Sequence, residues 1–255
     1  IDVAAAVAAG ILVVNTPAAS THAVADLAVG LIIAVQRKIA EFDSRLRQGE
    51  FASLRSEAPQ AVELRHQTLG VIGMGRIGRA VSERLHWGFG TRVIYYDIRE
   101  IGYLPFAAEA QDSAQAVYAH ADVVTLHVPL TSATRGMIDE HALSHFKPTA
   151  ILVNTSRGPV VQAEPLARAL KEGRLAGAGI DVFEPEPPPP DHPLLSAPNR
   201  GTAPNRGTAP NRGTAPSCVL TPHIGARSRE GIAGMNDVVD DIIAVLQGRE
   251  PMYPV

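Results

Sequence analysis

The sequence has little cysteine and little net charge. Cys218 is the only cysteine among 255 residues, which excludes a disulfide within the chain and a cysteine-built zinc site. A net charge of −3 gives no electrostatic reason to expect nucleic acid or a membrane as partner. The longest uncharged apolar stretch of the first helical segment, residues 27–35, is far shorter than the ~20 residues that span a bilayer. We therefore expect a soluble, cytoplasmic protein.

The most informative motif is a glycine fingerprint followed by an acidic residue. Gly73, Gly75 and Gly78 come directly after an apolar run. Such glycines allow a tight strand-to-helix turn, close approach to a pyrophosphate and packing of the helix, whose N-terminus offers free N–H donors. Asp97 ends the next apolar run, where its carboxylate can accept hydrogen bonds from ribose hydroxyls. The motif predicts a dinucleotide site, and its alternative is a structural glycine turn.

Apolar runs of strand length alternate with segments of helical period along the chain. This alternation is typical of a parallel sheet covered by helices on both faces. The expected strands are 69–73, 92–97, 122–128, 150–154, 177–182 and 218–221, and the helices between them include 76–85, 139–145 and 165–172. One long helix is expected before this block, up to about Val35, and another over 228–247, ended by Gly248. The sequence thus predicts an α/β fold with a doubly wound parallel sheet.

Seven motifs together resemble one known family over essentially the whole chain. They are NTP at 15–17, VAD at 24–26, GMGRIG at 73–78, HVPL at 127–130, NTSRG at 154–158, GIDVFEPEP at 179–187 and LTPHIG at 220–225. In this order they resemble the D-isomer-specific 2-hydroxyacid dehydrogenases, which include D-3-phosphoglycerate dehydrogenase and hydroxypyruvate/glyoxylate reductases. The resemblance implies a Rossmann-type NAD-binding domain, a second flavodoxin-like substrate domain and reduction of a 2-oxo acid with a nicotinamide cofactor.

The resemblance places the family's catalytic Arg, Glu and His on Arg157, Glu186 and His223. Adding hydride to a ketone builds negative charge on its oxygen, so an acid such as the imidazolium of His223 must deliver a proton. A carboxylate at Glu186 would favour and orient the imidazolium, and the planar fork of Arg157 would hold the substrate carboxylate. The alternatives are a structural histidine, a capping or surface arginine and a solvated acidic turn.

The resemblance also extends the expected NAD site beyond the glycine fingerprint. Asp181 is expected to face the nicotinamide, as the family's matching Asp does. The residues expected to contact NAD are Gly73, Gly75, Arg76, Ile77, Gly78, Asp97, Thr155, Ser156, Arg157, Asp181, His223 and Gly225. No metal site is expected. For His127, beside the expected cleft, packing and a functional role both stay open.

Two substitutions and one insertion depart from the family pattern. Gln162 stands where the family usually has a helix-capping Asp, and Asp26 replaces the usual Glu near the first long helix. Residues 200–217 contain a tandem repeat of APNRGT that looks inserted. With no apolar residue larger than Ala or Pro, the repeat is expected to form a mobile surface loop, and a phosphate site built from its arginines is the disfavoured alternative.

We expect three segments: a substrate-domain remnant at 1–17, the NAD-binding domain at 18–224 and a C-terminal helix and tail at 225–255 that return to the substrate domain. The expected activity is NAD-dependent interconversion of a 2-oxo acid and a D-2-hydroxy acid, by a homodimer in the complete protein. The alternatives are an NAD(H)-sensing corepressor-like module and a formate- or phosphite-oxidising relative. Because the chain begins within a family segment, these residues alone are expected to bind dinucleotide but turn over poorly.

Overall fold

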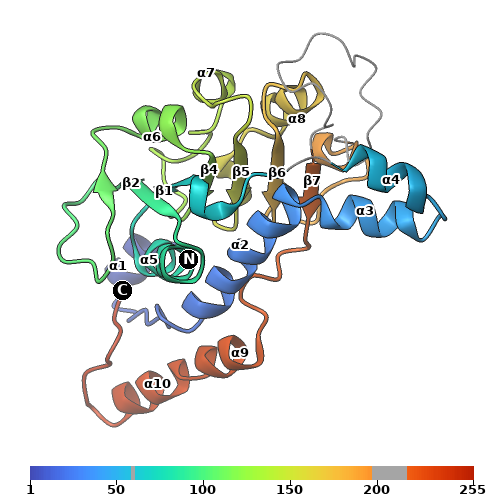
Figure 1. Ribbon diagram of the computed structural model, residues 1–255. Helices are drawn as coiled ribbons and strands as arrows, with labels where there is room; N and C mark the ends of the chain where they lie inside the picture. The colour runs from blue at the N-terminus through green and yellow to red at the C-terminus, as the bar shows by residue number, and fades with distance from the viewer. Residues whose placement is uncertain (59–60, 197–216) are drawn as a thin grey trace.

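The computed structural model describes residues 1–58, 61–196 and 217–255 (Figure 1). In these ranges seven strands form one parallel sheet in the spatial order β3-β2-β1-β4-β5-β6-β7. The strands are β1 (Thr68–Ile72), β2 (Arg92–Tyr96), β3 (Glu109–Ala110), β4 (Val123–Leu126), β5 (Ile151–Asn154), β6 (Gly177–Ile180) and β7 (Ser217–Leu220). This order confirms the predicted doubly wound parallel sheet, and it reverses direction between β1 and β4.

The central strands are almost entirely apolar, with Thr125 in β4 and Asn154 at the end of β5 as polar exceptions. All residues of β4, β5 and β6 are buried, as expected of strands covered by helices on both faces. The six predicted strands are present, with ends that differ by one or two residues. The edge strand β3 was not predicted, because it has only two residues and both are exposed.

Helices cover the two faces of the sheet in separate layers (Figure 1). One layer holds α6 (Ala114–His120), α7 (Glu140–Ser144) and α8 (Ala163–Lys171), and its core includes Val117 and Leu166. The other layer holds α2 (Thr21–Gln36) and α5 (Arg76–Phe89), and its core includes Leu31 and Val81. Helix α5 extends four residues beyond the predicted range and ends at Gly90, which adopts a left-handed conformation with φ 70°.

The remaining helical segments are short. They are α1 (Val3–Ala8), α3 (Ile39–Leu46), α4 (Phe51–Glu57) and the 3-10 turns η1 (Leu64–His66), η2 (Gly158–Val160) and η3 (Pro193–Ser196).

The structure shows the surroundings of the two residues that depart from the family pattern, Asp26 and Gln162. Asp26 of α2 accepts a hydrogen bond from Arg84 of α5 at 2.7 Å, and Gln162 precedes α8 without a capping hydrogen bond from its side chain.

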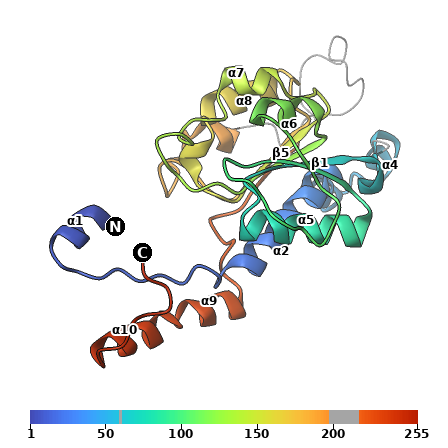
Figure 2. The ribbon, with the colours of Figure 1, turned by 90° about the vertical axis from the view of Figure 1, so that its left-hand side faces the viewer.

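The prediction of one helix over 228–247 is wrong. Two helices, α9 (Arg229–Met235) and α10 (Val238–Leu246), replace it. The helix is interrupted at Asn236 and Asp237, whose N–H groups donate to Ala233 and Gly234 three residues back, a tighter turn than an α-helix. Together with α1, these helices extend to one side of the sheet (Figure 2).

The two ends of the chain lie together. Val14 and Pro254 form an antiparallel bridge, and the N–H of Val255 donates to the carbonyl of Val13 at 2.9 Å. Most of the predicted insertion, residues 200–216, lies outside the described residues, whereas its last residue, Ser217, is the buried first residue of β7. Among the described residues, none of the helices has both the length and the apolar character of a membrane span.

Candidate active site

The glycine motif forms a tight turn between β1 and α5. Gly73 has φ 92°, and a Cβ there would lie 2.5 Å from the carbonyl oxygen of His127 on the neighbouring chain segment. A Cβ at Gly78 would lie 2.2 Å from the carbonyl oxygen of Gly73. The start of α5 can therefore pack against the glycine turn only when residue 78 is glycine. A Cβ at Gly75, in contrast, would meet no atom within 4 Å. The first and third glycines are therefore needed by the fold, and the second opens onto free space.

The residues around this turn fit a dinucleotide. Gly75 is the N-cap of α5 and provides no side-chain cap, so Arg76 and Ile77 begin the helix at an end that favours anions. Asp97 lies directly after β2 with 7% of its side chain exposed, and its carboxylate accepts a hydrogen bond from the N–H of Met74 at 2.8 Å. The buried Oγ1 of Thr155 has no hydrogen-bond partner among the described residues. The turn thus offers a place for a pyrophosphate, next to a carboxylate suited to a ribose.

Three loops meet at the carboxyl edge of the sheet, one after each of β5, β6 and β7. The predicted residues Arg157, Glu186 and His223 stand on these loops in that order. His223 Nδ1 lies 2.7 Å from Glu186 Oε2, and the N–H of Phe183 donates to the other carboxylate oxygen of Glu186 at 2.9 Å. The side chains of His223 and Glu186 are 46% and 37% exposed. The fold thus brings together an imidazole and a carboxylate that are 37 residues apart in the sequence.

The environment of Glu186 favours its ionised form. Partial burial raises the pKa of the carboxyl group, but the hydrogen bonds from His223 and from the Phe183 N–H outweigh it, helped by the charges of His223 and Arg157. The pKa of Glu186 is therefore lowered from its usual value. At neutral pH a carboxylate lies against His223, and such a partner stabilises an imidazolium.

The turn that carries Arg157 is held by Asn154, the last residue of β5. The Oδ1 of Asn154 accepts hydrogen bonds from the N–H and the hydroxyl of Ser156, at 3.0 and 2.7 Å. Its Nδ2 donates to the carbonyl oxygen of Arg157 at 3.1 Å. The guanidinium of Arg157 donates to the Ser156 carbonyl at 2.7 Å, and the residue is exposed. Asn154 therefore fixes the backbone of this turn, a role that was not predicted although Asn154 opens the NTSRG motif.

Asp181 anchors the loop that carries His223. Its buried carboxylate accepts hydrogen bonds from the Thr221 hydroxyl at 2.6 Å and from the N–H groups of Ile224 and Gly225, both at 2.9 Å. Its backbone carbonyl accepts from the N–H of His223 at 2.8 Å. These bonds hold His223 at φ 52°, which is uncommon for a residue other than glycine. The sequence placed Asp181 near the nicotinamide but did not predict this contact with the His223 loop.

His127 lies at the end of β4, next to the glycine turn, and its environment favours the neutral ring. Its Nε2 lies 2.9 Å from the hydroxyl of Thr125, and its enclosed Nδ1 has no hydrogen-bond partner among the described residues. Burial lowers the pKa of His127 to about 3. A neutral imidazole is therefore built into the fold beside the dinucleotide turn.

The partly buried His127 should make the protein less stable in mild acid. Above the unfolded pKa of about 6.5, folding costs nothing in protonation, whereas below it the unfolded state binds a proton that the folded state excludes. The free energy of unfolding should therefore fall by up to about 1.4 kcal/mol per pH unit as the pH drops from about 6.5 toward 3. Urea unfolding at several pH values would measure the slope for the wild type, for His127→Asn and for the exposed-site control His120→Asn. Parallel curves for the wild type and His127→Asn would contradict the prediction.

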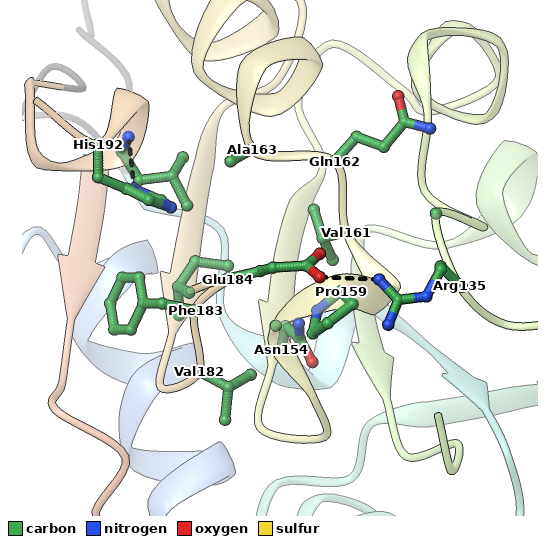
Figure 3. A pocket seen from close by; sticks show the side chains of 14 residues that line it. Arg135, Asn154, Pro159, Val161, Gln162, Ala163, Val182, Phe183, Glu184 and His192 are labelled. Atoms are coloured by element: carbon green, nitrogen blue, oxygen red, sulfur yellow. Dashed lines mark hydrogen bonds and ion pairs between the residues drawn. The ribbon is translucent and has the colours of Figure 1, made fainter. Parts of the chain in front are cut away.

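A cavity of about 250 Å³ lies behind the Arg157 turn. Its lining includes Asn154, Gly158 and His192, and Glu184 reaches toward Arg135 to form an ion pair at 2.8 Å (Figure 3). Arg157, Glu186 and His223 are not among the lining residues. The three catalytic candidates therefore do not line this cavity, although Gly158 and Glu184 of the same loops do. The cavity was not predicted from the sequence.

The chain is similar to known proteins over most of its length. The family model described as "D-isomer specific 2-hydroxyacid dehydrogenase, NAD binding domain" matches residues 29–225. A glyoxylate reductase from Korarchaeum cryptofilum is 40% identical over an alignment of 262 residues, gaps included. The alignment covers 98% of this chain and 71% of the relative.

Two solved structures bear on the cofactor. The D-isomer specific 2-hydroxyacid dehydrogenase from Lactobacillus delbrueckii in its NAD-complexed form is 30% identical, with a TM-score of 0.78 and coverage of 100% of this chain and 75% of that one. The NADPH-dependent glyoxylate/hydroxypyruvate reductase from Sinorhizobium meliloti is 33% identical, with a TM-score of 0.82 and coverage of 100% and 74%.

Proposed function

The chain belongs to the D-isomer specific 2-hydroxyacid dehydrogenase family, and we propose that it interconverts a small 2-oxo acid and the corresponding D-2-hydroxy acid. It is an oxidoreductase of the CH–OH group with NAD as its cofactor. The observation that carries the proposed chemistry is the 2.7 Å contact between His223 and Glu186. It places an imidazole and a carboxylate together at the edge of the sheet where doubly wound folds bind their ligands.

The roles of the side chains follow from which atoms are engaged. When bound, the nicotinamide supplies a hydride to the carbonyl carbon of the substrate. The Nδ1 of His223 is held by Glu186, so its Nε2 is the atom left to deliver a proton to the substrate oxygen. Glu186 orients the ring and offers a negative charge to its protonated form, and Arg157 binds the substrate carboxylate with its planar fork. In the reverse direction Nε2 accepts the hydroxyl proton.

The N-terminal and C-terminal segments complete the proposed organisation. We propose that residues 18–224 form the NAD-binding domain and that 1–17 and 225–255 belong to the substrate-binding part. The family model over 29–225 and the bridge between Val14 and Pro254 support this division.

A spectrophotometric assay tests the proposed function directly. The loss of NADH would be followed with glyoxylate, hydroxypyruvate and 3-phosphohydroxypyruvate, and NADH binding would be measured in parallel by calorimetry. We expect turnover with at least one of these acids. Tight NADH binding without turnover of any 2-oxo acid would instead favour an NAD(H)-sensing module, for which the same fold suffices.

NADH should be preferred over NADPH. Asp97, at the expected ribose position, would repel a 2′-phosphate and leave it without a counter-charge. The nearby Arg99, whose Nε lies 3.6 Å from the Asp97 carboxylate, is a positive charge that could oppose this effect. We expect a higher kcat/KM with NADH than with NADPH. Asp97→Ala should lower the ratio of the two kcat/KM values. The charge-matched control Asp43→Ala, on α3, should leave the ratio unchanged, whereas a wild-type preference for NADPH would overturn the role given to Asp97.

A further inference from the structure

Two histidines face each other on the outer side of α7. The helix begins at the N-cap Asp139, whose side chain accepts from the N–H of Ala142 at 2.7 Å. Ala142 and Leu143 are buried against the sheet, so the helix has a fixed orientation. This leaves His141, which is exposed, and the C-cap residue His145, which is partly exposed, one helical turn apart on the opposite side. The two imidazoles are thus held by a helix whose inner side is anchored.

The distance between the two rings is suited to a metal ion. His141 Nε2 and His145 Nε2 are 3.4 Å apart, and the ring planes make an angle of 86°. This separation exceeds the usual 2.7–3.2 Å, roughly, of a hydrogen bond with an N–H donor. Two nitrogens at about 2.0–2.1 Å from one Zn²⁺ lie about 3.3–3.4 Å apart when the angle at the metal is tetrahedral. Adjacent ligands at a square-planar ion would lie only about 2.8–3.0 Å apart.

We propose that His141 and His145 bind a Zn²⁺ ion through their Nε2 atoms. In the described part of the chain, no third His, Cys, Asp or Glu joins them in a metal-binding group. Glu140, the acidic residue next to His141 in the sequence, is engaged in ion pairs with Arg168 and Arg174. Water therefore completes the coordination, and the site is an open, two-ligand surface site.

The consequence of zinc binding is stabilisation of α7. A bound ion would link the two ends of this short helix, and a ligand that binds only the folded state raises stability by mass action. The site is separate from Arg157, Glu186 and His223, which stand on other loops. Zinc binding and turnover should therefore be independent, and the proposal does not rest on the proposed activity.

Calorimetric titration with ZnCl₂ tests the site, at a pH where imidazole is neutral. The wild type should show one saturable site. Since loss of even an outer partner of a zinc ligand costs about 10–100-fold in affinity, His141→Asn and His145→Asn should each weaken binding at least tenfold, roughly. The control is His120→Asn on α6, an exposed histidine whose Nδ1 already lies 2.8 Å from the carbonyl oxygen of Ala116. This control should bind zinc like the wild type.

Thermal unfolding gives a second, independent readout. Zinc should raise the Tm of the wild type and of His120→Asn, and should leave the Tm of the other two variants unchanged. All four proteins should fold alike without metal, because His120 and His141 are exposed and His145 is only partly buried. Saturable binding that survives both His141→Asn and His145→Asn, or a wild type that binds no zinc, would overturn the proposal.

Discussion

Replacing His223 by alanine is expected to lower kcat for ketone reduction by a factor of about 10²–10⁴, the range for loss of a positioned acid. The affinity for NADH should stay near the wild-type value, because the glycine turn and Asp97 are on other segments of the chain. The variant should also fold, since the His223 side chain is nearly half exposed. Steady-state kinetics with NADH and a reducible 2-oxo acid, beside calorimetry with NADH, would measure both effects.

Glu186→Gln is the matched comparison for this experiment. It keeps a side chain of the same size but removes the negative charge against the imidazole. The fall in kcat should be smaller than for His223→Ala, and the decline of the reduction rate with rising pH should begin at a lower pH. An unchanged pH profile would remove Glu186 from the mechanism, and a His223→Ala enzyme with wild-type kcat would remove the histidine.

Replacing Gly158 by alanine is expected to lower kcat by about 10²-fold, the cost of misplacing reacting groups by roughly 1 Å. A Cβ at Gly158 would lie 1.9 Å from the carbonyl oxygen of Phe183 and 2.1 Å from its carbonyl carbon. Both are backbone atoms, so the Arg157 turn and the loop that carries Glu186 must move apart. The same overpacking should lower the free energy of unfolding by about 1–3 kcal/mol. Kinetics and urea unfolding of one preparation would give both numbers.

The control for Gly158→Ala is the same substitution in the middle of α2. A Cβ at Gly30 would meet no atom within 4 Å. Gly30→Ala should therefore stabilise the protein by about 0.5–1 kcal/mol, the usual gain in a helix interior, and leave kcat unchanged. If Gly158→Ala behaved like Gly30→Ala, the two catalytic loops would not be in the contact described above.

The features that local sequence determines were predicted well. The glycine turn was predictable because the spacing of Gly73, Gly75 and Gly78 is set by steric contacts close to the turn itself. The buried strands were predictable because a strand covered on both faces is a nearly continuous apolar run. The positions of Glu186 and His223 came from motifs that resemble a family, and no local physical pattern brings these two residues together.

The features missed by sequence analysis depend on distant contacts or weak signals. The break between α9 and α10 at Asn236 lies within a continuous helical pattern, and it follows two glycines that favour helix only weakly. The hydrogen bonds from the Thr221–Gly225 turn to the Asp181 carboxylate join segments that are 40 residues apart. The cavity beside His192 arises from the packing of residues from four stretches of the chain, 135–136, 154–163, 180–184 and 192–194. In the last two cases the residues in contact lie far apart in the sequence, so the local sequence does not reveal the contact.

The double attachment of the His223 loop bears on the range of acids that the enzyme reduces. Asp181 holds the backbone of this loop, and Glu186 holds the ring itself. Both carboxylates follow the same strand, β6. If His223 is the proton donor, as proposed above, it is oriented during folding and not by the arriving substrate. Acids of different size and shape meet the same donor, and selectivity among them is left to the walls of the cleft.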